Sequence, residues 1–357
     1  MPDSSFDTRK KFMGVTLIVT AFVAVFSLYI CLAYASGKTI IVNDEEQTEE
    51  ALREESKPAE EIKIISWTID TKNLKDKKAD SLNIMIPAGM DASDVEISVR
   101  YDIPGISVTL KNTRESYFLS NPPKGCYDYI EEASGSFDGE NTTVSFGLTE
   151  SCLCSVEYEN STMELVLTPV SEAGHPLVVL DAGHGGEHSG VKAGKLCEKD
   201  VCLMIAKKVR DLSKDKAYTV LLTRSADESM TTEERIKSVE ALNPDYFISI
   251  HLSGDVEDVN KFGLSACYNG TYYHNGLENV EFADKVLRNV AINTQNRALG
   301  LFEAGEQELP LKVLNMPATY LYAGFLSNKE EAALLEKGAY IEKIAQGIID
   351  ALDEVIQ

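Results

Sequence analysis

The stretch Val178-Val-Leu-Asp-Ala-Gly-His-Gly-Gly186 decides the fold of the second half of this chain. The aliphatic run before Asp181 predicts a buried strand, and the glycines that follow predict a loop at the edge of a sheet. Ligands of α/β proteins bind at this carboxyl end of the strands. We therefore expect His184 to face a binding site, because the glycines around it remove side chains that would crowd a ligand of its imidazole.

A second strand and a helix supply two more polar side chains. The run Tyr246-Phe-Ile-Ser-Ile250 predicts a strand that ends in His251, and Glu198 begins a predicted helix. Two imidazoles and one carboxylate form a three-ligand set suited to catalytic Zn²⁺, whose fourth position is left for water or substrate. A plainer interpretation also fits, with two loop histidines and a glutamate that stabilises the start of a helix.

Strands and helices alternate from residue 176 to residue 357. This alternation predicts the fold class α/β, with a largely parallel, twisted sheet flanked by helices. The predicted helices cover residues 198–212, 232–242, 280–293 and 340–356. The predicted strands, besides the one that begins at Val178, cover residues 218–223, 246–250 and 318–322.

The motifs of this region occur in a characteristic order. They are Asp181-Ala-Gly-His-Gly-Gly, Gly194, Glu198-Lys-Asp-Val, Leu222-Thr-Arg, Glu234-Arg, Ser249-Ile-His and Gly324-Phe-Leu-Ser-Asn. Together they resemble the zinc-dependent N-acetylmuramoyl-L-alanine amidases (the type 3 amidase domain) over residues 176–357. The resemblance implies a zinc amidase-like fold and Zn²⁺ held by His184, Glu198 and His251. It also implies peptidoglycan as substrate, cleaved between N-acetylmuramic acid and the L-alanine of the stem peptide.

One position departs from the family pattern. The family carries a glutamate two residues before the glycine that Gly324 matches, and this glutamate acts on the zinc-bound water, whereas this chain has Tyr322. A tyrosine, with a reference pKa of about 10, is a poor base at neutral pH, so its hydroxyl is at best a donor to a developing oxyanion. The carboxylates that could substitute are Glu187, Glu303, Glu306 and Glu308.

Three functions remain open at this stage. The first is a membrane-anchored peptidoglycan amidase that acts in cell-wall remodelling with an unconventional base. The second is a catalytically impaired relative that binds peptidoglycan or a partner, such as a partner amidase or divisome protein, and regulates wall hydrolysis. The third is an exported metalloprotein that acts on another amide or peptide. Arg224 could contact an acidic stem peptide, although a structural role is favoured for both Arg224 and Arg235.

The start of the chain predicts a membrane anchor. Residues 12–35 contain no charged residue and exceed the roughly 20 residues that span a bilayer. Basic residues before the span assign residues 1–11 to the cytoplasm, so residues 12–35 form a single-pass anchor with everything after it outside the cytoplasm. The resemblance to the amidases implies that this membrane is the bacterial cell membrane and that the outer side is the cell-wall side. A cleaved signal peptide is the alternative, because Ala33-Tyr-Ala35 offers a cleavage site.

Two regions separate this span from the amidase-like region. Residues 36–62 are rich in glutamate and predict an acidic, solvated linker. Residues 63–172 contain short alternating runs separated by turn residues, which predict a small β-sandwich. Its pattern and position vaguely resemble the AMIN-type domains that bind cell wall, and a plain spacer fits nearly as well. The net charge of −23 argues against a nucleic-acid partner, which needs a basic face.

Overall fold

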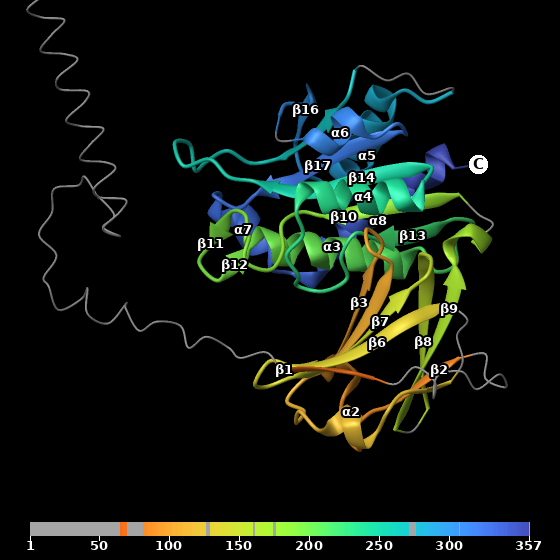
Figure 1. The fold of residues 1–357 in the computed structure, drawn as a ribbon. Coiled ribbons are helices and arrows are strands. Elements are labelled where there is room, and N and C mark those ends of the chain that lie inside the picture. The colour runs from red at the N-terminus through yellow and green to blue at the C-terminus, as the bar shows by residue number, and fades with distance from the viewer. Residues whose placement is uncertain are drawn as a thin grey trace, which may run out of the picture. The chain divides into compact units, whose positions relative to one another are not determined.

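The computed structural model describes residues 65–69, 81–125, 129–159, 161–173, 176–270, 276–306 and 308–356 (Figure 1). Residues 1–11, the expected anchor at 12–35 and the expected linker at 36–62 lie outside this set, so these three assignments stay predictions. Among the residues that are described, no helix has the length and apolar character needed to cross a membrane. The β strands of the first half and the α/β elements of the second belong to one unit, Ile62–Gln357.

Six strands of the second half form one sheet (Figure 1). In chain order they are β10 (Leu177–Ala182), β13 (Thr219–Leu222), β14 (Tyr246–Ser253), β15 (Leu264–Tyr268), β16 (Ala298–Glu303) and β17 (Ala318–Phe325). Their order across the sheet is β13-β10-β14-β17-β15-β16. Strands β13, β10, β14 and β17 run parallel to one another, whereas β15 is antiparallel to β17 and parallel to β16. The sheet is therefore mixed.

The predicted α/β class is confirmed, and the predicted parallel arrangement is found in β13, β10, β14 and β17. The prediction did not include β15 and β16. Both missed strands carry weak sequence signals. The run Leu264-Ser-Ala-Cys-Tyr268 contains small residues, and β16 is interrupted by Gly300, which strands disfavour in their interior. Pairing with β17 supplies the stability that their local sequences do not.

Helices cover both faces of this sheet. They are α3 (Glu198–Leu212), α4 (Thr232–Leu242), α5 (Asn279–Thr294), α6 (Leu309–Val313), α7 (Lys329–Leu335) and α8 (Gly338–Val355). Alternate strand residues point to opposite faces, so Val178 and Leu180 pack with α3, α5 and α8. Leu177 and Val179 pack with α4 and α6 on the other side. This alternation fixes the register of β10 and so the place where its last residues emerge.

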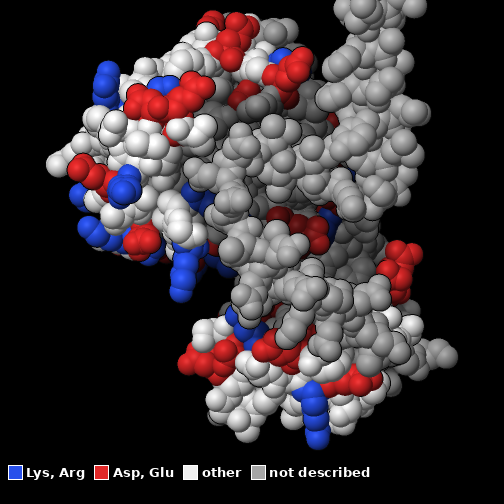
Figure 2. Space-filling view, turned by 90° about the vertical axis from the view of Figure 1, so that its left-hand side faces the viewer, with Lys and Arg blue, Asp and Glu red and all other residues white. Residues whose placement is uncertain are grey.

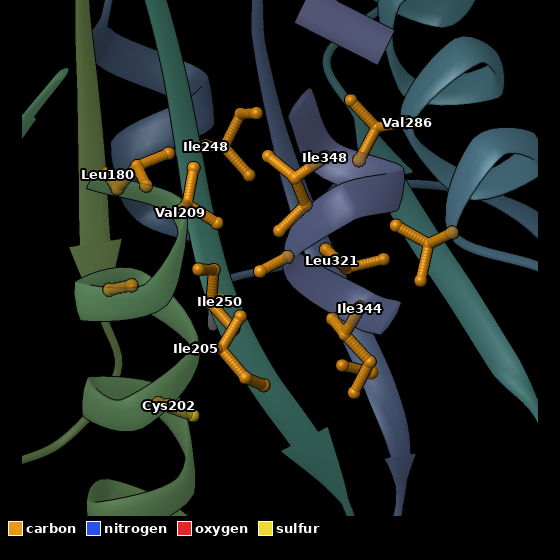
Figure 3. Packing of buried hydrophobic residues seen from close by; sticks show 14 of the residues in the cluster. Leu180, Cys202, Ile205, Val209, Ile248, Ile250, Val286, Leu321, Ile344 and Ile348 are labelled. Carbon is orange, nitrogen blue, oxygen red and sulfur yellow. The ribbon is translucent and has the colours of Figure 1, made fainter. Parts of the chain in front are cut away.

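The larger core lies between the sheet and helices α3, α5 and α8. Figure 3 shows Leu180, Ile248 and Leu321, from three neighbouring strands, beside Ile205 of α3 and Ile348 of α8. Each of these side chains is fully buried. The strands that carry the site residues are thus anchored by a closely packed layer that extends to their carboxyl ends.

Helices α5 and α8 approach each other closely at Gly347. A Cβ atom added to Gly347 would lie 2.5 Å from the Cα and 2.7 Å from the backbone nitrogen of Val290. We expect Gly347→Ala to lower the free energy of unfolding by about 1–3 kcal/mol, because the two helices must move apart. Gly338→Ala is the matched control, since a Cβ there meets nothing within 4 Å. Urea unfolding of both variants checks this, and equal stabilities would contradict the close approach.

The first half of the chain is built from antiparallel strands. They are β1 (Ile65–Thr68), β2 (Leu82–Met85), β3 (Val95–Arg100), β4 (Gly105–Leu110), β5 (Lys124–Gly125), β6 (Ile130–Phe137), β7 (Thr142–Leu148), β8 (Cys152–Glu159) and β9 (Thr162–Pro169). Two sheets result, β1-β6-β7-β4-β3 and β5-β2-β9-β8, with a short helix, α2 (Tyr117–Ser120), after β4. Residues from both sheets, such as Ile84, Val108 and Leu165, share one apolar core. The AMIN-type assignment stays a prediction.

Candidate metal centre

His184 lies in the loop that follows β10, between Gly183 and Gly185. Its backbone has φ +57°, a left-handed conformation that is uncommon for a residue with a side chain. A Cβ atom on Gly183 would overlap the imidazole of His251, and one on Gly190 would overlap the carboxylate of Glu198. Gly183 and Gly190 therefore allow the end of β10, His251 and the start of α3 to approach one another.

Glu198 is the first residue of α3, which follows a short hairpin formed by β11 (Lys192–Ala193) and β12 (Leu196–Cys197). Its side chain is buried and bridges the two imidazoles. His184 Nε2 lies 3.1 Å from Glu198 Oε2, and His251 Nδ1 lies 2.9 Å from Glu198 Oε1. The structure thus brings together the three residues that the sequence predicted as a ligand set.

The donor set and its spacing fit a zinc ion. One nitrogen of each histidine and one carboxylate oxygen all lie within 4.8 Å of one another. Two atoms that bind zinc tetrahedrally at about 2.0–2.2 Å lie roughly 3.3–3.6 Å apart, so small movements bring these atoms to ligand positions. His184 and His251 are partly exposed, whereas Glu198 is buried. A solvent-facing side therefore remains open, as a catalytic site requires.

Backbone groups hold the Glu198 carboxylate in place. The N–H of Val191 donates to Oε2 and the N–H of Leu252 donates to Oε1, both at 2.9 Å. Burial opposes the negative charge, but hydrogen bonds from His184, His251 and Leu252 outweigh it and keep the pKa of Glu198 well below its usual range. Glu198 is therefore ionised at neutral pH, the state that binds a metal.

A buried ion pair fixes the loop that carries His184. Arg235 donates to the carboxylate of Asp181, to Ala182 O at 2.9 Å and to His184 O at 2.5 Å. Asp181 also accepts hydrogen bonds from the hydroxyls of Thr223 and Ser249. The structural role favoured for Arg235 from the sequence matches these contacts, because the guanidinium connects the end of β10 directly to the loop.

Arg224 also holds the backbone in place. It does not make the substrate contact that was one of the two roles expected for it. Its side chain is fully buried and donates to four backbone oxygens, those of Ala182, Gly183, Lys199 and Ala226. These bonds use the guanidinium inside the domain, where a substrate has no access. Arg224 is a positioning residue, since it connects the His184 loop to the first turn of α3.

The buried Asp181–Arg235 pair predicts a loss of stability in acid. Burial opposes the charge on Asp181, but Arg235, Ser249 and Thr223 lower its pKa from 3.8 to about 2. The pKa of this carboxyl group is lower in the folded state than in the unfolded state. Its contribution to stability is therefore fully present at pH values above the unfolded-state pKa, and it is lost as pH falls through the folded-state pKa. From about pH 4 to pH 2 we expect Asp181 to account for a loss of about 2 kcal/mol in the free energy of unfolding.

The variant Asp181→Asn tests this dependence. Its free energy of unfolding, measured by urea denaturation across the same pH interval, should fall less steeply than that of the wild type. Identical slopes in the two proteins would contradict the assignment of this acid-sensitive step to Asp181.

Comparison with known proteins identifies the family. Residues 178–354 match the model of the family described as N-acetylmuramoyl-L-alanine amidase. The germination-specific N-acetylmuramoyl-L-alanine amidase of Bacillus subtilis (strain 168) is 30% identical over 188 residues, which cover 48% of this chain and 76% of that protein. This chain belongs to the N-acetylmuramoyl-L-alanine amidase family. The β strands of residues 63–172 lie outside the matched range.

Two further similarities cover the same half of this amidase-family chain. An uncharacterised protein, YqiI of Bacillus subtilis (strain 168), is 29% identical over 195 residues, which cover 54% of this chain and 92% of that protein. Among solved structures, the catalytic domain of CwlV, an N-acetylmuramoyl-L-alanine amidase of Paenibacillus polymyxa var. colistinus, is 30% identical with a TM-score of 0.47. It covers 50% of this chain and 97% of that domain.

Tyr322 lies beside the candidate metal site, on the same face of the sheet as His251. The two residues are in register on the parallel strands β17 and β14, and their ring centroids are 6.0 Å apart. Tyr320, two residues earlier, stacks on His251 with a centroid distance of 5.2 Å and an interplanar angle of 7°. No motif marks Tyr320 in the sequence, although the alternation of β17 places it on the same face as Tyr322.

The hydroxyl of Tyr322 donates to Glu308 Oε1 at 2.5 Å. Burial and this hydrogen bond to a carboxylate raise the pKa of Tyr322 well above its ordinary value. Its single proton is therefore engaged, and the oxyanion contact expected from the sequence would require this bond to break. Of the four carboxylates considered as substitutes, Glu308 is buried, whereas Glu187, Glu303 and Glu306 are exposed.

A cleft of about 570 Å³ adjoins Tyr322 and extends from the carboxyl ends of β14 and β17 toward β16. Its walls combine aromatic and charged side chains, namely Asp258, Lys261, Phe262, Arg297, Phe302 and Phe325 together with Tyr322. Figure 2 shows that acidic and basic side chains lie side by side on the described part of one face of the molecule. No single sequence motif predicts this cleft, because its lining comes from separate loops and strands.

Proposed function

We propose that this chain is a zinc-dependent peptidoglycan amidase. It hydrolyses the bond between N-acetylmuramic acid and the L-alanine of the stem peptide during cell-wall remodelling. The observation that carries the proposal is the cluster of His184, Glu198 and His251, whose ligand atoms all lie within 4.8 Å of one another. Family membership supports the substrate class.

The metal and the protein contribute different parts of this chemistry. Zinc held by these three residues would act as a Lewis acid that polarises the scissile carbonyl and lowers the pKa of water to about 7. The chain's own groups orient the donors. Glu198 is fixed by two backbone N–H groups, and Arg235 and Arg224 hold the loop of His184.

The cleft beside Tyr322 suits an acidic peptide substrate. Arg297 and Lys261 provide positive charge in its walls, whereas Asp258 contributes a negative charge to the same lining. Lys261 is also partly neutralised by Asp255 at 2.6 Å. Phe262 and Phe302 are exposed apolar side chains in the same cleft. A stem peptide, which carries carboxylates and short aliphatic side chains, matches this combination of charge and apolar surface.

The proposed location is the outer face of the bacterial cell membrane. Residues 12–35 form the single-pass anchor, residues 36–62 the acidic linker, and the folded unit lies on the cell-wall side. The uncharged run of residues 12–35 and the basic residues that precede it support this orientation.

Mass spectrometry of purified peptidoglycan tests the proposed function. Full-length protein with Zn²⁺ is expected to release free stem peptides that begin with L-alanine, and His184→Ala is expected to release none while retaining the wild-type unfolding transition. Products cut within the glycan strand or within the peptide, or no products from the wild type, would contradict the amidase assignment.

The presence of Tyr322 where the family carries a glutamate favours a second candidate. If this tyrosine silences hydrolysis, the chain is a regulator that binds peptidoglycan or a partner such as another amidase. Wild-type protein would then bind purified cell wall with its zinc in place and release no stem peptides. The same peptidoglycan digestion, combined with a sedimentation assay for wall binding, separates this candidate from the first.

A further inference from the structure

A tyrosine and a buried carboxylate form a hydrogen-bonded pair beside the candidate metal centre. Neither residue belongs to the elements that carry the three predicted metal ligands. Glu308 immediately precedes α6, and its side chain reaches β17 to accept the Tyr322 hydroxyl at 2.5 Å. The other oxygen of the same carboxylate accepts the N–H of Gly305 at 2.8 Å. Glu308 is 8% exposed, so both of its oxygens are held inside the domain.

The remaining carboxylates near the site, among the residues that the structure describes, have other tasks. Asp181 is bound by Arg235 and two hydroxyls, and Glu198 bridges the two histidines. Glu187, Glu303 and Glu306 are exposed. Glu308 is thus a buried carboxylate, separate from the metal ligands, that is joined by a hydrogen bond to a side chain beside His251.

We propose that Glu308, acting through the hydroxyl of Tyr322, replaces the carboxylate that the family carries on the strand. This inference rests on the proposed amidase function. In this proposal Tyr322, whose ring centroid lies 6.0 Å from that of His251, exchanges protons with the reacting atoms, and Glu308 is the positioning residue and proton acceptor behind it. The carboxylate has moved from β17 to the start of α6, and the longer tyrosine side chain spans the difference.

The proton transfers balance in both directions. As the oxygen of the attacking water bonds to the amide carbon, its proton moves to the Tyr322 oxygen while the tyrosine proton moves to Glu308. When the carbon–nitrogen bond breaks, Glu308 returns its proton to the Tyr322 oxygen, and the tyrosine proton passes to the leaving nitrogen. The hydroxyl is neutral before and after each step, so no phenolate has to persist.

A kinetic cycle tests the pair. Glu308→Gln and Tyr322→Phe are each expected to lower kcat by roughly 10²–10⁴-fold with KM little changed, because positioned acid–base groups contribute about this much. The double variant Tyr322→Phe/Glu308→Gln should be no slower than the slower single variant, since both changes interrupt one path. Glu306→Gln, an exposed carboxylate two residues away, is the matched control and should keep the wild-type rate.

Two additional variants and one metal-free measurement separate catalysis from folding. Tyr322→Glu in the Glu308→Gln background should recover activity, because it returns a carboxylate to the strand. Zinc affinity should be unchanged in Glu308→Gln and Tyr322→Phe. In metal-free protein, the shifts in urea midpoint of these two variants should not add in the double variant, because both remove the same hydrogen bond.

The outcomes distinguish the two proposals. Wild-type rates in Glu308→Gln, with an active wild type, would overturn the inference and leave the amidase function intact. Multiplicative losses in the double variant, or a parallel loss of zinc affinity, would also overturn it. A wild type that holds zinc and releases no stem peptides would overturn the amidase function together with this inference.

Discussion

Replacing Glu198 with alanine is expected to weaken zinc binding by more than about a hundredfold and to abolish hydrolysis. Mutating a residue that only orients a metal ligand lowers metal affinity by about 10- to 100-fold. Glu198 is predicted to be a ligand itself, so its loss should cost more. It also bridges both imidazoles and accepts the N–H groups of Val191 and Leu252. Its loss leaves these donors without their acceptor.

The matched control is Asp200→Ala, which removes another acidic residue from the first turn of α3. Competition with a chromophoric chelator measures the zinc affinity of both variants. Asp200→Ala should bind zinc as the wild type does. An affinity of Glu198→Ala within about twofold of the wild type would show that the metal is held elsewhere.

Replacing Arg235 with leucine is expected to lower the free energy of unfolding by about 3–5 kcal/mol, because it leaves the charge of Asp181 buried without its partner. The side chains of Arg235 and Asp181 are 7% and 1% exposed. The change also releases the backbone oxygen of His184, so the loop of the proposed metal site should loosen and zinc affinity should fall.

Arg288→Leu provides the comparison at the surface. Arg288 pairs with Glu354 at 2.9 Å, but these side chains are 52% and 38% exposed, so its loss should change the free energy of unfolding by less than about 1 kcal/mol. Urea unfolding at neutral pH measures both variants. Similar losses in the two would contradict the special role of the buried pair.

Much of the amidase half was predictable, because local pattern and packing agree there. The helix at residues 198–212 was predicted from apolar periodicity and matches α3, and the helix at residues 232–242 matches α4. The latter begins at a capping box formed by Thr231 and Glu234, a purely local signal. His184 and His251 were predicted as site residues because each follows an apolar run that ends at the same edge of a parallel sheet.

The contacts between distant residues were not predictable from these patterns. Arg224 donates to backbone oxygens, which exist at every position, so no sequence signal identifies its acceptors. The sequence offered Glu303, Glu306 and Glu308 in one loop without a way to rank them. Only the packing of α6 against β17 makes Glu308 buried and brings it to Tyr322.

The most direct test of the central claim is anomalous diffraction at the zinc absorption edge from crystals of the zinc-loaded protein. We predict one strong peak at about 2.0–2.2 Å from a nitrogen of His184, a nitrogen of His251 and an oxygen of Glu198. A peak bound by other residues, or no peak at these three side chains in crystals that contain zinc, would contradict the claim.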